Sequence, residues 1–353
     1  MKDEVIPSEI YAGSIIMSRV RLARNLEGYP FKVKDVPTAK EIIKKVNRAV
    51  VKCDTFNLFY TSNLTATELE AMKERHLISQ NLIDNRECGA ALINSDESIS
   101  IMINEEDVIR EQCFMRGLML TEAYKRLQLI DDELSKNLDI AYDERYGYLT
   151  ACPTNLGTGL RASVMMFLPA LTESGKIVAL SEEVERLGLT IRGVYGEGSK
   201  AEGYIYQISN EVTLGVSEYD ILLEVEQTAM EICKAERDEM EKLFTKKELY
   251  TMDKARKSFG VLTNALLLDY KEFLSHVAWV KLGAMLGMIN ISDIKQIDDL
   301  IVSVRPANLC QQQHKRLSAI ERDLFRAEIV GKKLLKIKDK ICNTIRFLVM
   351  YIK

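Results

Sequence analysis

The chain has 353 residues, of which 47% are hydrophobic and 28% charged, and its formal net charge at pH 7 is −4. This composition is typical of a globular protein with a buried core, and the length allows about two domains. The slightly acidic balance gives no support for direct nucleic-acid binding, and no run approaches the roughly 18 apolar residues that span a bilayer, so we expect no membrane contact.

The N-terminal residues lack the apolar segment of a secretory signal, which indicates a cytoplasmic protein. The seven cysteines are widely spaced and without a C-x-x-C pair, and only three histidines accompany them. We therefore expect no Cys/His zinc site and no metal held by the protein itself. Most of the cysteines are interpreted as small buried side chains in a reducing compartment.

The first two-thirds of the chain mixes strands with helices. In chain order, the hydrophobic pattern predicts a helix at 38–53, strands at 57–60 and 98–104, helices at 117–138 and 162–171, a helix capped by Ser181, and strands at 189–194 and 204–208. No regular βαβ repeat is present. This arrangement predicts an α+β fold, an antiparallel sheet flanked by helices.

From residue 217 onward, apolar residues recur at helical spacing with almost no strand signal, which predicts an all-α part. The expected helices are 217–244, 247–258, 261–286, 293–300 and 311–351, the last interrupted by Gly331. We place a domain boundary near 240–250, with one domain at 8–240 and a second at 241–353.

Two short segments place charged side chains in patterns that suit a phosphorylated ligand. Arg19 and Arg21 alternate in the segment 18–24, so on a strand both would point to the same face. Two neighbouring guanidinium groups can each bind phosphate oxygens bidentately, although a solvated basic strand edge is the alternative. In the segment 104–107, acidic residues end a strand and Arg110 follows, which indicates either an acidic turn or one half of a cation site.

Two glycine-rich loops complete the set. The stretch 152–163, CPTNLGTGLRAS, places two glycines ahead of a predicted helix, with Arg161 at the helix start. Because helix N-termini favour anions, this arrangement predicts a phosphate site, although the G-K-[ST] of a Walker loop is lacking. The stretch 192–199 offers Arg192 and Glu197 on a glycine-rich loop, which by itself is also typical of a plain surface turn.

In this order and spacing, the four segments resemble the phosphagen (guanidino) kinase family over about residues 8–239. CPTNLGTGLRAS is the most specific motif, and NEED (104–107) and RG-x-x-GE (192–197) support it. The resemblance implies transfer of the γ-phosphoryl group of ATP, which brings Mg²⁺ with it, to a guanidinium group. It implies that Glu106 and Glu197 grip the guanidinium, that either is the base, and that Cys152 is the reactive cysteine beside it.

The resemblance also implies the residues that contact ATP. They are five arginines, one histidine and the neighbours of these residues in the same motifs: Ser18, Arg19, Val20, Arg21, His76, Arg110, Arg161, Ala162, Ser163, Val164, Met165, Arg192, Gly193, Val194, Tyr195 and Gly196.

Within that family, the layout resembles the bacterial protein-arginine kinases of the McsB type. Only 18 residues precede Arg19, so the small helical domain that metabolite kinases of the family carry there is expected to be absent, and a helical domain follows instead. The resemblance implies a catalytic domain at 8–240 and a helical regulatory and dimerisation domain at 241–353. The latter contains RDLFRA (322–327), which matches an RDxxRA motif that forms a phosphoarginine pocket; the residues concerned are Arg322, Asp323, Arg326 and Ala327. A charged helix face with two arginines one turn apart is the alternative.

Three positions depart from the family pattern. Val108 replaces the histidine that usually follows NEED, Met17 stands where a serine is common, and Phe167 stands where McsB-type sequences often have histidine. The carboxylates, the arginines and the cysteine all remain. We therefore expect the departures to affect rate and substrate preference more than the class of reaction.

The sequence thus predicts a protein-arginine kinase that phosphorylates exposed arginine side chains of proteins by direct in-line transfer. The resemblance further implies a homodimer, an activator protein, a Clp ATPase or protease that degrades the marked proteins, and a heat-shock repressor as a substrate in the stress response. Two alternatives remain open. One is a kinase for free arginine or another guanidino metabolite, and the other is a catalytically weak adaptor that binds phosphoarginine proteins.

Overall fold

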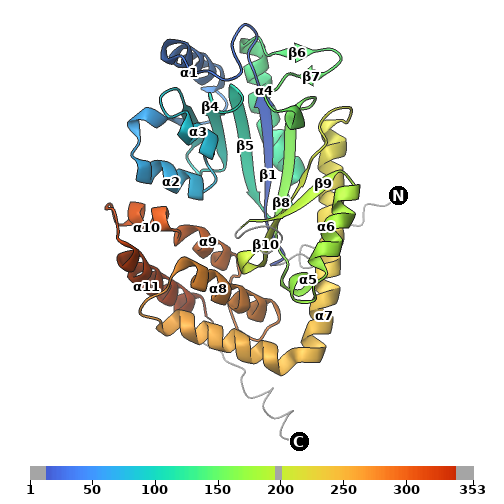
Figure 1. The fold of residues 1–353 in the computed structure, drawn as a ribbon, viewed down its shortest axis with the longest axis vertical. Coiled ribbons are helices and arrows are strands. Elements are labelled where there is room, and N and C mark those ends of the chain that lie inside the picture. The colour runs from blue at the N-terminus through green and yellow to red at the C-terminus, as the bar shows by residue number, and fades with distance from the viewer. Residues whose placement is uncertain (1–12, 195–200, 339–353) are drawn as a thin grey trace, which may run out of the picture.

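The computed structural model describes residues 13–194 and 201–338, and its central feature is an eight-stranded sheet (Figure 1). The strands lie in the order β2-β3-β4-β5-β1-β8-β10-β9, and every neighbouring pair is antiparallel. Their bounds are β1 (Ile15–Arg24), β2 (Phe56–Tyr60), β3 (Ala90–Asn94), β4 (Ile99–Ile103), β5 (Ile109–Arg116), β8 (Leu160–Phe167), β9 (Leu189–Gly193) and β10 (Ile205–Asn210). The strands β6 (Tyr142–Asp143) and β7 (Gly147–Tyr148) form a separate hairpin. The predicted α+β fold around an antiparallel sheet is confirmed.

Eleven α-helices occur in the described residues. Those between or beside the strands are α1 (Val36–Val50), α2 (Ala66–Glu74), α3 (Gln80–Asp84), α4 (Leu120–Asn137), α5 (Pro169–Glu173) and α6 (Ile177–Arg186). Those that follow the sheet are α7 (Glu218–Asn264), α8 (Tyr270–Met285), α9 (Lys295–Ser303), α10 (Pro306–Gln312) and α11 (Ala319–Ile337). The long helix α7 leaves helical geometry at Lys247, where φ is −134° and ψ is 28°.

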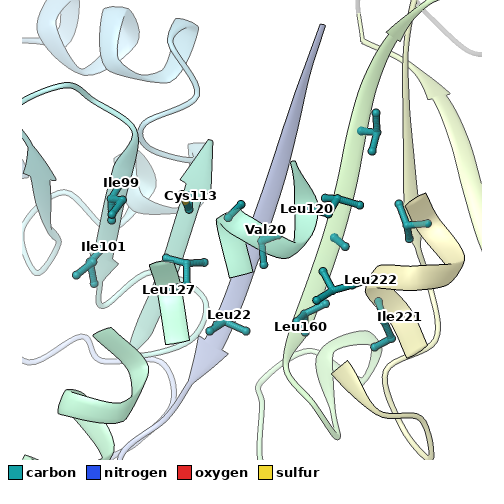
Figure 2. Packing of buried hydrophobic residues seen from close by; sticks show 14 of the residues in the cluster. Val20, Leu22, Ile99, Ile101, Cys113, Leu120, Leu127, Leu160, Ile221 and Leu222 are labelled. Carbon is teal, nitrogen blue, oxygen red and sulfur yellow. The ribbon is translucent and has the colours of Figure 1, made fainter. Parts of the chain in front are cut away.

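One face of the sheet is covered by α1, α4 and the first part of α7, and the main core lies between them. Leu120 and Leu127 of α4 pack over Val20 and Leu22 of β1 (Figure 2). Burying each such leucine stabilises the fold by roughly 1.5–3 kcal/mol. Because side chains alternate along a strand, burial of one set in this core sends the intervening residues of β1 to the opposite face of the sheet.

The C-terminal helices α8 to α11 lie beside the second half of α7 (Figure 1), and a second core joins them. It also includes Phe167 and Ile205 from the sheet, so the helical part packs directly against β8 and β10. On its other side α10 packs against α2. No helix in the described ranges is both long and apolar enough to cross a membrane.

The predicted helix at 162–171 is wrong over most of its length, because residues 162–167 belong to the central strand β8 and only residues 169–171 begin the short helix α5. β8 lies between β1 and β10, and its side chains are buried or nearly so on both faces. A strand buried on both faces has no clear alternation, and its apolar run cannot be told from a helix by periodicity. Arg161 therefore lies on a strand and not at a helix N-terminus, and the helix dipole does not contribute to its site.

Three other expectations for helix ends are also wrong. The helix α6 begins at Ile177, so Ser181 lies inside it and does not cap it. Gly331 does not interrupt α11, where a Cβ would lie 3.5 Å from the carbonyl oxygen of Thr263 on α7. The predicted helix at 261–286 is two helices, because α7 ends at Asn264 and Asp269 caps α8 by accepting from the backbone of its first turn.

Candidate active site

The face of the sheet opposite α1 and α4 carries four arginines, Arg19, Arg21, Arg110 and Arg161. Arg21 of β1 is opposite Arg161 of β8 in the strand register, and Arg110 of β5 is opposite Ala23. Burial, followed by repulsion from Arg110 and Arg161, lowers the pKa of Arg19 to about 9, and the pKa of Arg21 falls well below its ordinary value for similar reasons. Of the four, Arg110 pairs with the carboxylate of Glu105, so the group of guanidinium charges is only partly compensated and favours the binding of an anion.

Unpaired donors among these arginines point in the same direction. Arg19 Nη2 donates to Gln207 Oε1 at 2.8 Å, but the buried Nε atoms of Arg21 and Arg161 have no hydrogen-bond partner in the described part of the chain. Buried polar groups without a partner cost free energy, and in native proteins they are rare. The phosphate oxygens of a nucleotide are acceptors of the kind that these donors lack.

The two glutamates of the acidic turn after β4 have different surroundings. Glu105 is buried and accepts from Arg110 Nη1 at 2.9 Å and from the hydroxyl of Ser79, while its other oxygen accepts from the backbone N–H of Glu106 at 2.8 Å. Glu106 itself lines a pocket. Loss of solvent, and then repulsion from Glu105 and Asp107, raise the pKa of the Glu106 carboxyl.

The loop that carries Cys152 is tied to this acidic turn. Asp107 Oδ1 accepts from the backbone N–H of Ala151 at 2.6 Å and from Asn25 Nδ2 at 2.7 Å. The Cys152 Sγ lies 3.0 Å from Thr154 Oγ1, within a single 3₁₀ turn at Pro153–Asn155. The aspartate thus fixes the position of the cysteine relative to the acidic turn.

Gly157 lies in the same loop, where it allows the chain to pass close to the backbone of Thr213. Its φ is +109°, and a Cβ there would lie 2.3 Å from the carbonyl oxygen of Thr213. Thr213 in turn donates from Oγ1 to the carbonyl oxygens of Thr154 and Leu156, at 3.1 and 2.7 Å. Only glycine fits both the conformation and the close approach, which explains its place in the motif.

One pocket of about 110 Å³ brings the predicted chemical groups together. Its lining includes five residues that the sequence singled out, namely Arg21, Glu106, Arg110, Cys152 and Arg161. A carboxylate and a sulfur therefore lie beside three guanidinium groups. Such a pocket can hold a phosphoryl group next to a cationic acceptor.

A second, much smaller hollow of about 10 Å³ is lined by Arg19, His76, Ser163 and Met165, four of the predicted ATP contacts. Burial, then the charges of Arg19, Arg305 and Arg21, lower the pKa of His76 to about 3. The imidazole is therefore neutral at pH 7, and its Nε2 is buried without a hydrogen-bond partner among the described residues.

The same hollow is also lined by Phe114 and Gln207, which sequence reasoning missed. Arg110 and Phe114 are four residues apart on β5, so they share a face of that strand. If 109–116 is taken as a strand, the alternation of its side chains places Phe114 on the face of Arg110, and this is the signal that identifies it. Gln207 is opposite Met165 in the register of β8 and β10, which no local pattern reveals.

Several predicted ATP contacts lie elsewhere. The side chains of Val20, Ala162 and Val164 are fully buried in the main core on the helix-covered face, so only their backbone faces the site strands. Ser18 donates from Oγ to the carbonyl oxygen of Gly117 at 2.8 Å. These four residues shape the strands and do not project side chains into either hollow.

The last glycine-rich segment is only partly described. Arg192 lies on the edge strand β9, where its Nη2 is 3.2 Å from Glu211 Oε1 and its side chain is exposed. Gly193 ends that strand, and the backbone N–H of Val194 donates to Ile205 O at 2.9 Å. Tyr195, Gly196 and Glu197 lie outside the described residues, so the second predicted carboxylate is not placed.

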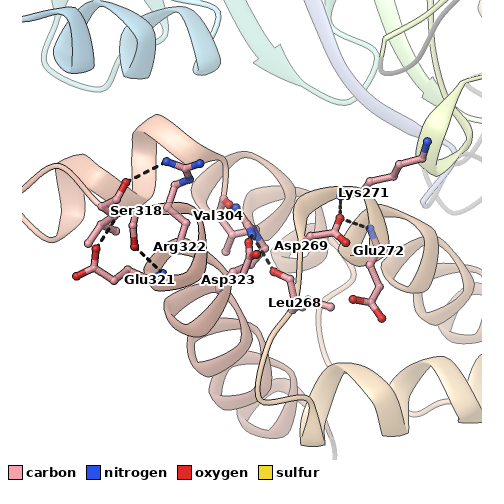
Figure 3. Close-up of polar contacts among 11 residues, drawn as sticks. Leu268, Asp269, Lys271, Glu272, Val304, Ser318, Glu321, Arg322 and Asp323 are labelled. Atoms are coloured by element: carbon pink, nitrogen blue, oxygen red, sulfur yellow. Dashed lines mark hydrogen bonds and ion pairs between the residues drawn. The ribbon is translucent and has the colours of Figure 1, made fainter.

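The RDLFRA motif lies in the first half of α11, and Figure 3 shows two of its residues, Arg322 and Asp323. Arg326 is buried, and it donates to Asp323 Oδ1 at 2.7 Å and to the carbonyl oxygens of Leu268 and Val304 at 2.8 and 3.0 Å. Arg322 donates to Leu317 O at 3.0 Å and is only partly buried. Ala327 is buried in the second core. The motif thus joins α11 to the segments before α8 and α10.

The three departures from the family pattern fall in different surroundings. Val108 is fully buried in the main core, and Phe167 is buried in the second core, with its ring 6.3 Å from that of Tyr204. Met17 lines the small hollow beside Arg19. Of the three, only Met17 has its side chain in the candidate site.

Two family models match the chain one after the other. Residues 38–239 match the ATP:guanido phosphotransferase C-terminal catalytic domain, and residues 247–344 match the protein-arginine kinase McsB C-terminal domain. Similarity to individual proteins extends over both parts.

The protein-arginine kinase of Caldanaerobacter subterraneus subsp. tengcongensis is 41% identical over 328 residues, which are 91% of this chain and 97% of that protein. That of Clostridium novyi is 42% identical over 325 residues, 91% of this chain and 94% of that protein. Among solved structures, the duplicated taurocyamine kinase of Schistosoma mansoni with bound transition-state analogue components has a TM-score of 0.59 and 29% identity, over 66% of this chain and 34% of that chain. By these matches the chain belongs to the ATP:guanido phosphotransferase family and, within it, to the protein-arginine kinases.

Proposed function

We propose that this protein transfers the γ-phosphoryl group of ATP to arginine side chains of other proteins. One observation carries the proposal, namely that Glu106 and Cys152 share a pocket with Arg21, Arg110 and Arg161. The names of the relatives and the match of the C-terminal part to the McsB family support a protein as the acceptor.

The nucleotide phosphates would bind to the arginine cluster. Arg19, Arg21, Arg110 and Arg161 present guanidinium groups to one face of the sheet, and the unpaired Nε donors of Arg21 and Arg161 would be satisfied by phosphate oxygens. Mg²⁺, held mainly by the phosphates and water, would neutralise further charge. Arg192, at the sheet edge, would join the cluster only after its contact with Glu211 is released.

The acceptor guanidinium would lie at the Glu106 and Cys152 end. In direct in-line transfer, a guanidinium nitrogen forms a bond to the γ-phosphorus while the bond from that phosphorus to the β–γ bridging oxygen breaks, and ADP leaves. A carboxylate takes the nitrogen's proton. The raised pKa of Glu106 suits such a base, and Glu197 is its predicted partner in gripping the cation.

The chain would divide its work between a catalytic domain at 8–240 and a helical regulatory and dimerisation domain at 241–353, with a phosphoarginine pocket at RDLFRA. The departure of α7 from helical geometry at Lys247 supports a boundary near this place. The family resemblance supports a homodimer, an activator protein, a Clp protease that receives the marked proteins and a heat-shock repressor as a substrate. The free cysteines of the described residues fit a cytoplasmic location.

The test is to incubate the pure protein with Mg-ATP and an unfolded arginine-containing protein, with free arginine in a parallel sample, and to follow ³¹P NMR for an acid-labile P–N signal. We expect the signal on the protein acceptor. Glu106→Gln should reduce the rate by roughly 10²–10⁴-fold. Glu133→Gln, on the surface of α4, serves as the matched control.

The other outcomes separate the alternatives. A signal on free arginine alone would contradict a protein acceptor and favour a kinase for a guanidino metabolite. No signal on either acceptor, even with an activator present, combined with binding of phosphoarginine proteins, would favour an adaptor.

A further inference from the structure

The end of α2 connects the helical part of the chain to the candidate nucleotide site. Glu74 is the last residue of α2 and is buried, and its carboxylate points to α10. Both carboxylate oxygens accept from the backbone N–H of Ala307, at 3.0 and 3.1 Å, and Oε2 also accepts from Asn308 N at 2.9 Å. A buried carboxylate needs such donors in place of water. Glu74 therefore caps the first turn of α10 from the other side of the junction.

The next residue strengthens the same junction. Arg75 Nη1 donates to Asn308 Oδ1 at 2.9 Å and to Gln311 Oε1 at 2.7 Å, both on α10. In the reverse direction, Arg305 Nη1 donates to the backbone carbonyl of Glu74 at 3.2 Å. Two consecutive residues at the end of α2 are thus held by the helical part through side-chain and backbone contacts.

The residue after these two is His76, which lines the hollow with Arg19 and Gln207. Its φ is +64°, a left-handed conformation that costs free energy for any residue other than glycine and persists only where its surroundings impose it. Its backbone carbonyl accepts from Gln112 Nε2 at 2.9 Å. The direction of the imidazole therefore depends on how the end of α2 is held.

We propose that Glu74 is a positioning residue of the nucleotide site. By capping α10 it fixes the last turn of α2, and through the strained backbone of His76 it sets the direction in which the imidazole faces the hollow lined by Arg19 and Gln207. This inference rests on the proposed function, because it takes that hollow to be part of the nucleotide site. It gives the helical part of the chain a direct connection to nucleotide binding through packed contacts, separate from the acceptor end.

The test compares Glu74→Ala, Glu74→Gln and, as a matched control on the same helix, Glu70→Gln, whose carboxylate pairs with Lys73 and not with α10. Mg-ADP binding is measured by calorimetry, and the imidazole signals are measured by NMR, where only three histidines contribute and His76→Gln identifies the relevant one.

We expect Glu74→Ala to shift the His76 signals and to raise both the Kd for Mg-ADP and the KM for ATP by about tenfold. The kcat at saturating ATP should change by less than about twofold. Glu74→Gln retains one acceptor oxygen and should raise the Kd by only about threefold, and Glu70→Gln should match the unaltered protein.

Unchanged His76 signals and unchanged Mg-ADP affinity in Glu74→Ala would overturn the inference. A loss confined to kcat would overturn it as well. If Glu74→Ala fails to fold by circular dichroism, Glu74→Gln carries the test, with a smaller rise of about threefold in Kd expected and no rise overturning the inference. Failure of the proposed function is distinguishable, because Mg-ADP would then leave the His76 signals of the unaltered protein unmoved.

Discussion

The carboxylate of Glu105 accepts a hydrogen bond from Arg110 Nη1 at 2.9 Å, whereas the next residue, Glu106, turns its carboxylate into the pocket lined by the same arginine. Burial alone would raise the pKa of Glu105, but Arg110 and the hydrogen bonds from Ser79 and the Glu106 backbone lower it. Glu105 is therefore an ionised anchor for an arginine, and Glu106 is the acid that remains available to a ligand.

This division predicts different kinetic effects for the two glutamates, a lower rate of transfer for Glu106→Gln and a higher KM for ATP for Glu105→Gln. Glu105→Gln removes the charge that holds Arg110, so the KM for ATP should rise by about tenfold while transfer at saturating ATP is largely kept. Steady-state kinetics with varied ATP checks this, with the exposed Glu87→Gln as a control. A loss of transfer at unchanged KM for ATP would show instead that Glu105 acts on the acceptor.

The neutral state of His76 predicts a pH effect on stability. Its pKa is about 3 in the folded protein against an ordinary value of 6.5, so the unfolded chain binds the proton more tightly. The stability of the unaltered protein relative to His76→Gln is therefore complete above pH 6.5 and is lost as pH falls from 6.5 toward 3, by up to about 1.4 kcal/mol per pH unit. Urea unfolding of both proteins at pH 7.5, 6.0 and 5.0 measures the difference. A difference independent of pH would mean that the folded imidazole titrates normally.

The sequence points to the charged and reactive residues of the candidate site, but not to the uncharged side chains that line the hollow with them. Glu106, Cys152 and the arginines could be found because charged and reactive residues recur in a recognisable order. Phe114 and Gln207 could not, because their place in the hollow depends on pairing between strands that are far apart in the sequence. Tertiary burial also outweighed local pattern in β8, where the apolar run of a central strand gave the signal of a helix.

The same comparison explains one departure from the family pattern. Val108 lies just after the acidic turn, where its backbone N–H donates to Asn25 Oδ1 at 2.8 Å and its side chain is fully buried. The sequence alone does not show whether a histidine would fit at this position, because it does not show that the side chain faces the core. Here an apolar residue fits the site, and the backbone contact that shapes the turn does not depend on the side chain.

Cys152 should be the most readily alkylated cysteine among those described. Burial raises the pKa of the thiols of Cys53, Cys88, Cys113 and Cys233, which slows their reaction, whereas Cys152 is partly exposed and lines the pocket. Brief treatment with iodoacetamide should inactivate the enzyme in proportion to labelling at Cys152, as measured by mass spectrometry.

Two further measurements make the alkylation prediction specific. Mg-ATP with a guanidinium acceptor should slow the labelling of Cys152, and Cys152→Ser should resist inactivation while keeping a reduced rate of transfer. Full activity after complete labelling of Cys152 would contradict its place beside the acceptor.

Substitution of the two arginines of RDLFRA should show that Arg326 stabilises the fold and that Arg322 does so much less. Arg326 is buried and donates to three acceptors, so Arg326→Ala leaves them unpaired and should lower the free energy of unfolding by about 3 kcal/mol. Arg322 makes one contact with a backbone carbonyl in the described structure and is partly exposed, so Arg322→Ala should cost no more than about 1 kcal/mol. Urea unfolding measures both, with the exposed Arg316→Ala as a control.

Phosphoarginine binding by calorimetry completes this test. Arg322→Ala should lose binding while remaining folded, because its guanidinium is the more accessible of the two. Arg326→Ala should lose binding together with stability, since its contacts with Asp323 and Val304 hold the residues of the proposed phosphoarginine pocket in place. If Arg326→Ala remains stable but no longer binds phosphoarginine, the Arg326 guanidinium must leave its protein acceptors for the ligand. Its contacts with Leu268, Val304 and Asp323 would then belong to the unliganded protein alone.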